Sequence, residues 1–503
     1  MKIVVKRLIA ISLTAIMLLS VLTSCKTSSG NQNNNSATTD NSNQTGAQNA
    51  TAQETTLLYP DLPAQDFGGY NFRFLTRSWK DQVDWGEWDH RDISATEENG
   101  DVINDAVFAR NKKIEDKYNI TISETPVEDF AGTFRKMVKA GDDSYDVVCP
   151  HIIEFASYAQ EGDFVDLFTV PNMDLTKPWW NQGCTRDLSV MHKQFVMQGD
   201  LLIIDNDAME AMIFNKSLLQ QNALESPYDI VKRGDWTFDK LIEMSKGVSK
   251  DLNGDGQMYI LDDRFGCILQ ADTDISFIVS GGEKICAKDA NDIPIITYGS
   301  DRCYSIENKM SEMALDENDF INLHRYAGKF GIYDEQVQMF SEDRALFSWI
   351  RMRIVERLRG MDTDFGIIPL PKLDSAQTNY ITHMNPHTGA GISIPVTNSD
   401  LARTGTILED LSAESRYTLQ PAYYDVNLRG KFARDEESQG MLDIILNNTA
   451  YDIGYIYNFG NFAMTIVYYG RDKKTDYASA FEKMQAKMQT DIDKTVAAYE
   501  KLG

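Results

Sequence analysis

Cysteine and histidine are scarce in this sequence, with six of each among 503 residues. The cysteines include no C-x-x-C pair, which excludes the usual zinc-binding spacing. His383 and His387 are four residues apart, but Pro386 between them disfavours a helix that would aim both at one metal ion. No disulfide framework is predicted, and Cys286 and Cys303 either pair across a hairpin or remain free thiols.

The motifs of several enzyme classes are also absent. The sequence has no G-x-S-x-G, no Walker loop and no G-x-G-x-x-G fingerprint. Basic residues are few, with 49 Lys and Arg against 75 Asp and Glu, for a net charge of −26. This balance argues against nucleic acid as a partner, because phosphate binding needs a basic surface. Acidic residues are too many to exclude a glycoside hydrolase from the sequence alone.

Residues 1–24 have the pattern of a secretory signal peptide. A basic start is followed by an apolar run, 8–21, that is too short to be a comfortable membrane span. The run ends in LTSC (22–25), which resembles a bacterial lipobox and implies cleavage before Cys25 and a lipid on that residue. The alternative is an ordinary signal peptide in which Cys25 is incidental.

Residues 25–56 are predicted to be the lipidated cysteine and a disordered tether. The stretch NQNNNSATTDNSNQTGAQNATAQ has Asp40 as its only charge and no large apolar residue, so it cannot bury enough surface to fold. As a random coil, the tether would reach ~30 Å. No other segment is long and apolar enough to span a membrane, which predicts a lipid-anchored protein at the outer face of the cell membrane.

Hydrophobic periodicity predicts an α/β protein. Strand and helix patterns alternate over five segments, which predicts a βαβαβ unit with a mostly parallel sheet. These segments are 70–77, 101–119, 120–125, 129–141 and 144–150. Further strands are predicted at 200–207, at the start of 209–224, at 344–350 and at 365–372, and the chain after Asp400 reads as largely helical.

Several stretches in order resemble one protein family. They are GDVINDAVFARNKKIEDKYNI, EFASYAQEGDFVDL, PWWNQ, DWTFDKLIEMSKGVSKDLNGDGQ, FGIIPLPKLDSAQTNYIT and YYDVNLRGKFARDEESQGMLDIIL. Together they are similar to the extracellular solute-binding lipoproteins of Gram-positive bacteria, which resemble maltose-binding protein in fold and serve carbohydrate ABC importers. The resemblance extends over nearly all of residues 70 to 470.

The resemblance implies a two-lobed periplasmic-binding-protein-like fold of type II, with a ligand cleft between the lobes. Lobe one is expected at 57–208 plus 346–400, and lobe two at 209–345 plus 401–503. The implied function is non-enzymatic: capture of a sugar or oligosaccharide for delivery to a membrane permease. Two alternatives stay open, a surface-anchored glycoside hydrolase and the same fold binding a peptide.

A loop rich in Trp and acidic residues follows the first predicted strand. Loops after the carboxyl ends of parallel strands line the ligand crevice, aromatic rings cover sugar faces, and carboxylates bind hydroxyls. Ligand contacts are therefore predicted for Trp79, Asp84, Trp85 and Trp88, together with Asp207 and Trp349 where the chain is expected to cross between lobes. The alternative for each Trp is that it only packs beneath the loop.

The segment DLNGDGQMYILDD (251–263) nearly has the register of an EF-hand calcium loop. The predicted ligands are Asp251, Asn253, Asp255, the carbonyl of Gln257, and Asp262. The twelfth position is Asp rather than Glu, and Gly266 disfavours a long exiting helix. A structural calcium ion and a bare turn without metal are therefore left as equal alternatives.

Overall fold

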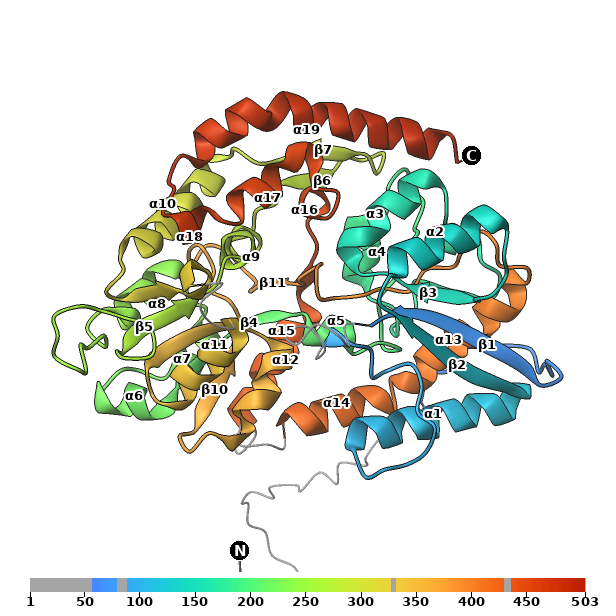
Figure 1. Cartoon of the computed structure of the whole chain (residues 1–503), viewed down its shortest axis with the longest axis horizontal. Helices are drawn as coiled ribbons and strands as arrows, with labels where there is room; N and C mark the ends of the chain where they lie inside the picture. Colours follow the sequence, from blue (N-terminus) through green and yellow to red (C-terminus); the bar gives the residue numbers. More distant parts are fainter. Residues whose placement is uncertain (1–56, 79–87, 327–331, 429–435, 503) are drawn as a thin grey trace, which may run out of the picture. The chain divides into compact units, whose positions relative to one another are not determined.

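The computed structural model of the chain describes residues 57–78, 88–326, 332–428 and 436–502. Contacts divide the chain after Thr56, and every element described below belongs to the unit Leu57–Gly503. Figure 1 shows two groups of strands in this unit, each covered by helices. We call these groups lobe one and lobe two.

Lobe one is built on the predicted βαβαβ unit. Its three strands are parallel, in the order β2-β1-β3. The elements are β1 (Tyr70–Arg77), α1 (Val102–Tyr118), β2 (Ile120–Val127), α2 (Phe130–Ala140) and β3 (Val147–Cys149). Local sequence sets their ends: the Asp101 side chain accepts amide hydrogens at the start of α1, and Gly141 ends α2 in the left-handed region at φ 66°.

The chain returns to lobe one through residues 384–400. Ser393 is bridged to Val148 of β3, and Ile392 is bridged to Met197. The other helices that pack here are α3 (Ile152–Glu161), η2 (Leu167–Thr169), α4 (Gln182–Leu188), α13 (Leu401–Ser415) and α14 (Leu419–Leu428). Lys117 and Lys113 of α1 form ion pairs with Asp410 and Glu414 of α13.

Lobe two contains a mixed five-stranded sheet in the order β10-β4-β9-β5-β8. The strands are β4 (Glu210–Asn215), β5 (Phe265–Leu269), β8 (Phe320–Asn322), β9 (Ala345–Arg351) and β10 (Phe365–Ile368). β4 runs antiparallel to both of its neighbours, whereas β9, β5 and β8 are parallel to one another. All residues of these strands are buried, as expected for a sheet with helices on both faces.

The remaining elements surround this sheet or lie between the lobes. Before β9 they are α5 (Ile204–Asp207), α6 (Lys216–Gln221), α7 (Pro227–Arg233), α8 (Phe238–Ser245), α9 (Thr273–Ser280), β6 (Cys286–Lys288), β7 (Pro294–Ile296), α10 (Asp301–Leu315), η3 (Leu323–Tyr326) and α11 (Ile332–Ser341). After β9 they are α12 (Met352–Val355), η4 (Glu356–Gly360), β11 (Thr382–His383), α15 (Glu436–Asn447), β12 (Thr449–Ala450), α16 (Ile453–Ile456), η5 (Phe459–Asn461), α17 (Phe462–Ile466), α18 (Tyr469–Asp472) and α19 (Tyr477–Glu500).

The predicted division of the lobes differs from this arrangement in two places. Segment 346–400 was assigned to lobe one, but β9 and β10 both pair with β4 in lobe two. Segment 401–503 was assigned to lobe two, but α13 and α14 pack on α1. The physical reason is that hydrophobic periodicity identifies a strand or helix without identifying its partner, which here lies far away in the sequence.

Two smaller sequence interpretations are also resolved. The strand predicted at 200–207 is wrong: the segment ends in the short helix α5, because the Asp92 carboxylate accepts the amide hydrogens of Ile203 and Ile204. Cys286 and Cys303 are buried free thiols rather than a disulfide.

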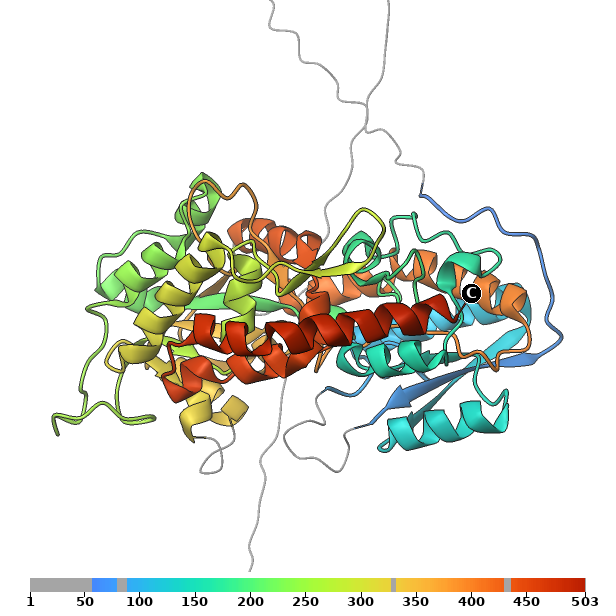
Figure 2. The same ribbon diagram turned by 90° about the horizontal axis from the view of Figure 1, so that it is seen from above.

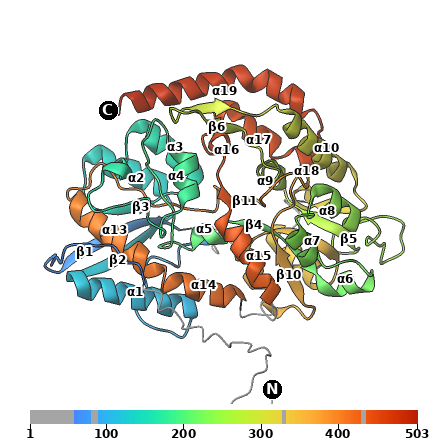
Figure 3. The same cartoon turned by 180° about the vertical axis from the view of Figure 1, so that it is seen from behind.

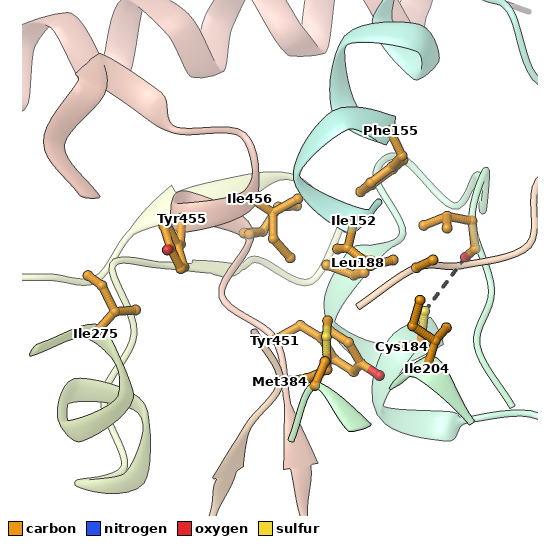
Figure 4. Packing of buried hydrophobic residues seen from close by; sticks show 14 of the residues in the cluster. Ile152, Phe155, Cys184, Leu188, Ile204, Ile275, Met384, Tyr451, Tyr455 and Ile456 are labelled. Carbon is orange, nitrogen blue, oxygen red and sulfur yellow. Dashed lines mark hydrogen bonds between the residues drawn. The ribbon is translucent and has the colours of Figure 1, made fainter. Parts of the chain in front are cut away.

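One apolar cluster continues from lobe one into lobe two. Figure 4 shows Ile152 and Phe155 of α3, Ile275 of α9, and Tyr455 of α16 as members of this cluster. The long helix α19 lies across both lobes in Figure 2. Its Thr495 hydroxyl accepts a hydrogen bond of 2.9 Å from Gln160 of α3. Apolar burial therefore joins the lobes on the α16 and α19 side.

Asp274 of α9 provides a test of how the C-terminal helices are attached. Its buried carboxyl accepts the Gly470 amide hydrogen at 2.6 Å, and burial raises its pKa to about 8. The folded state therefore holds a proton that the unfolded state releases near pH 4, so stability declines as pH rises from about 4 to about 8.

We predict that Asp274→Asn abolishes this contribution. The unfolding free energy of the variant relative to the parent should rise by up to about 1.4 kcal/mol per pH unit between about pH 5 and about pH 8. Denaturant titrations of both proteins at several pH values measure this difference. The pH dependence that other buried acids contribute is the same in both proteins and cancels. A difference that is independent of pH would contradict the assignment.

Candidate functional site

The strand ends of both sheets meet between the lobes. Asp272 follows β5, His324 follows β8, and Arg351 ends β9. His151 follows β3 from the side of lobe one, and Glu210 begins β4, which runs antiparallel to β9 and so starts at the same edge. Ligands of open α/β sheets bind outside the carboxyl ends of the strands, which makes this region the candidate site.

Two carboxylates and an arginine form the centre of the region. The Asn385 amide donates to Glu210 at 3.0 Å and to Asp272 at 3.3 Å. Arg351 is paired with Asp272, and His383 Nδ1 lies 2.8 Å from Glu210. We call Glu210, Asp272, Arg351, His383, Asn385 and Tyr455 the interlobe cluster.

The charges of the interlobe cluster stabilise one another. Burial opposes ionisation of Asp272, but the charge of Arg351 and of nearby histidines holds its pKa below the usual range. Burial likewise opposes the charge of Arg351, whereas Tyr333 and Asp272 raise its pKa. The ring of Tyr455 stacks on His383 with centroids 5.9 Å apart, and burial beside these carboxylates raises the pKa of its hydroxyl.

Aromatic rings surround the guanidinium of Arg351. Its central carbon lies 5.7 Å from the Trp88 ring, 5.7 Å from the Tyr333 ring and 5.4 Å from the Trp349 ring. Trp88 comes from the segment after β1, whereas Tyr333 and Trp349 belong to α11 and β9 of lobe two. Such cation–π contacts stabilise a buried cation and fix the position of its hydrogen-bond donors.

Several buried polar atoms in this region have no hydrogen-bond partner among the described residues. They are Trp88 Nε1, Trp349 Nε1, Arg351 Nε, the Tyr455 hydroxyl and the Thr388 hydroxyl. Native proteins pair nearly all buried polar groups with protein, water or ligand. Three of these five atoms are obligate donors, so the region is suited to a ligand that carries hydrogen-bond acceptors.

A second set of charges also crosses between the lobes. Arg91, from the segment after β1, donates to both oxygens of Asp207 in α5 at 3.1 Å and to Glu356 in η4 at 2.8 Å. Arg353 lies 3.2 Å from Glu356 and 3.8 Å from Asp207. Burial raises the pKa of Asp207 although both arginines favour its charge. These contacts join lobe one to lobe two through hydrogen-bonded ion pairs.

The structure places three of the six predicted ligand residues in this region. Trp88 and Trp349 flank Arg351, and Asp207 binds Arg91. Trp79, Asp84 and Trp85 lie outside the described residues. Contact of any of the six with a ligand stays a prediction.

Sequence reasoning missed most of the interlobe cluster. One signal was available: Glu210 and Arg351 are charges inside the otherwise apolar runs MEAMIF and FSWIRM. Asp272, Asn385 and Tyr455 carried no such signal.

Comparison with known proteins bears on the fold. No family model and no curated protein matches the chain. A cyclo/maltodextrin-binding protein complexed with maltotetraose is similar in structure, with TM-score 0.55 and 12% identity over 84% of this chain and 97% of that one. An ABC substrate-binding protein from Listeria monocytogenes in complex with cycloalternan has TM-score 0.53 and 11% identity over 84% and 99%.

A sugar transporter from Rhizobium etli in an open conformation gives TM-score 0.55 and 9% identity over 84% of this chain and 99% of that one. At identities this low, the structural similarity shows a common fold and nothing finer. The predicted two-lobed α/β fold, similar to that of the maltose-binding proteins, is therefore confirmed.

The loop 251–263 forms a turn held by its own side chains. Both carboxylate oxygens of Asp251 accept amide hydrogens, from Gly254 at 2.6 Å and Gly256 at 2.8 Å. Asp262 is exposed, whereas the neighbouring Asp263 is buried and accepts two amide hydrogens. Among the described residues, no group of three or more His, Cys, Asp or Glu is arranged to hold a metal ion. Calcium binding by this loop therefore stays a prediction.

The Asp251→Ala variant separates the role of Asp251 in holding the turn from its predicted role as a calcium ligand. We expect the variant to melt at a lower temperature than the parent in excess chelator, because two amide hydrogens lose their acceptor. If calcium binds, the gap widens when calcium replaces the chelator. Asp262→Ala is the matched control: its exposed carboxylate should matter only in calcium. Equal melting of parent and Asp251→Ala in chelator would contradict the turn role.

Proposed function

We propose that the chain is the substrate-binding component of an ABC transporter and captures a sugar or oligosaccharide between its lobes. The observation that carries the proposal is the convergence of carboxylates, aromatic rings and unpartnered buried donors at the strand ends of both lobes. Carboxylates and amides bind sugar hydroxyls, and indole rings offer both an apolar face and a donor. Two of the three similar structures named above contain a sugar, maltotetraose or cycloalternan, which supports a carbohydrate ligand.

The geometry favours binding over hydrolysis. A glycosidase needs one carboxyl free to protonate the substrate and a second free to attack it or to activate water. Both oxygens of Glu210 are already hydrogen-bonded, to Asn385 and to His383 and Ser276. Asp272 is tied to Arg351 and Asn385. Arg351 holds the pKa of the Asp272 carboxyl below its usual range, so this group suits binding of a hydroxyl better than donation of a proton. Cleavage of oligosaccharides on incubation with the protein would contradict this proposal.

Removal of the Tyr455 hydroxyl tests whether the interlobe cluster binds the ligand. We expect Tyr455→Phe to leave the melting temperature unchanged, because the buried hydroxyl has no partner among the described residues. The same change should weaken oligosaccharide binding by about 1 kcal/mol, or roughly fivefold in Kd, because the ligand loses a hydrogen bond. A thermal-shift screen of oligosaccharides and peptides identifies the ligand, and calorimetry measures the change.

Tyr380→Phe is the matched control. The Tyr380 hydroxyl accepts from the Trp236 amide and donates to the Val231 carbonyl, both at 3.2 Å, inside lobe two. Its loss should lower stability by about 1 kcal/mol or more and leave affinity unchanged. If Tyr455→Phe binds the identified sugar as tightly as the parent, the Tyr455 hydroxyl does not contact it. Stabilisation by peptides and by no sugar would favour the peptide alternative.

We further propose that Cys25 carries a lipid that anchors the protein at the outer face of the cell membrane, beside a permease. The LTSC junction after an apolar run and the polar segment behind it support this proposal. None of the described helices is long and apolar enough to cross a membrane. Cys25→Ala should release the protein from the membrane fraction after removal of the signal peptide. Continued partitioning of the processed variant with membranes would show another anchor.

A further inference from the structure

A groove of about 1020 Å³ opens on the other side of α5 from the interlobe cluster. Asp205, Asn206 and Met209 line this groove, whereas Asp207 and Glu210 face the polar region described above. Successive residues at the start of β4 point to opposite faces, so α5 and β4 form a partition between the two sites. Figure 3 shows the groove-lining helices α4, α14 and α15 around α5.

Polar side chains without a free cation line the groove. Its three cations are all ion-paired: Arg416 with Asp200 at 2.8 Å, and Arg186 and Lys284 with Asp187 at 2.7 and 2.8 Å. Amides predominate among the other polar residues of the lining, including Asn181, Gln182, Asn206, Gln420, Asn447 and Asn448. The groove therefore offers no site for an anion and many sites for neutral hydrogen-bonding groups.

Asp205 lies at the base of this groove and is only 3% exposed. One carboxylate oxygen accepts the Asn206 amide hydrogen at 2.9 Å, and no cation of the described residues lies within ion-pair distance. Burial, with the nearby charges of Asp92 and Asp200, raises the pKa of this carboxyl. A buried carboxyl without a cation is costly unless another group donates to it.

Two more acceptors are available at the groove. The side-chain amide of Asn447 donates to the backbone carbonyl of Asp443 in α15, and that of Asn448 donates to the carbonyl of Ile444, both at 2.9 Å. Their side-chain carbonyl oxygens accept no hydrogen bond from the described residues. With Asp205, these oxygens make the groove a set of acceptors that a hydroxyl-rich molecule would satisfy.

We propose that this groove is a second binding site, for a short oligosaccharide. Sugar hydroxyls donate to the carboxyl and amide oxygens and accept from neighbouring amide hydrogens. The volume is at the upper end of the usual range for ligand sites, roughly 300–1,000 Å³, which fits several sugar units. A peptide with a free carboxylate is disfavoured because each lining cation is already paired. The site is separate from the interlobe cluster and does not depend on that cluster binding sugar.

Hydrogen–deuterium exchange of the full chain without its signal peptide tests the proposal. The probes are millimolar maltotetraose, cellotetraose, xylotetraose and mannotetraose. We expect at least one to slow exchange in segments 181–188, 200–206 and 441–450, separately from any effect at 270–276 or 383–389. Protection of none of the groove segments by any probe would overturn the proposal.

Variants then assign the protection to the groove. Combined Asn447→Ala and Asn448→Ala should raise the sugar concentration for half-protection of groove segments roughly tenfold, because two acceptors are lost. Both residues are outside the core, so the fold is expected to persist. Asp205→Ala should also raise this concentration, because both carboxyl oxygens are removed, whereas Tyr455→Phe should not shift groove protection. If neither groove variant changes the sugar concentration for half-protection, or if Tyr455→Phe changes it equally, the proposal of a separate site in the groove is wrong.

Discussion

The pairing of Arg351 with Asp272 is the constraint on which the space between the lobes depends. A buried ion pair is tolerated only when both charges gain further hydrogen bonds or ring contacts that offset desolvation. Asn385 supplies a donor to Asp272, and the rings of Trp88, Tyr333 and Trp349 surround the guanidinium. These partners come from four separate parts of the chain. Satisfying one pair of charges therefore fixes β9, the end of β5, α11, the segment after β1 and the return to lobe one.

The same constraint explains why α5 and the start of β4 separate two chemically different surfaces. Glu210 is held toward Asn385 and His383, which turns Met209 to the opposite face. One turn earlier, Arg91 holds Asp207 on the side of the interlobe cluster, while Asp205 lies in the groove. On the side of the interlobe cluster Asp207 is paired with arginines, whereas on the groove side Asp205 has no cation partner among the described residues. A few residues of alternating direction thus determine which groups each surface presents.

The sequence predicts local structure in lobe one well and long-range structure poorly. The βαβαβ unit was predicted because its elements are sequential neighbours with clear periodicity and caps such as Asp101. The placement of β9 and β10 depends on their pairing with β4, across more than a hundred residues, and periodicity carries no information on such pairing. The candidate site follows the same rule. Composition and expected crossings pointed to Trp88, Asp207 and Trp349, whose contact with a ligand stays a prediction. No local pattern indicates that Glu210 and Asn385 meet, because 175 residues separate them.

The contacts between the lobes are of two kinds, and the difference indicates where the lobes can part. On the α16 and α19 side, one apolar cluster continues from Phe155 of α3 to Ile275 of α9, and separating it would expose apolar surface at about 25 cal/mol per Å². Around Arg91 the contacts are largely buried ion pairs with Asp207 and Glu356. When the lobes part, these charges lose one another but regain the water that burial removed, so much of the cost is offset. Opening along the polar side while the apolar side holds is therefore the motion of lowest cost. Such a motion would expose the unpartnered donors around Arg351 to an incoming ligand, and acceptors of the ligand would give these donors partners on closure.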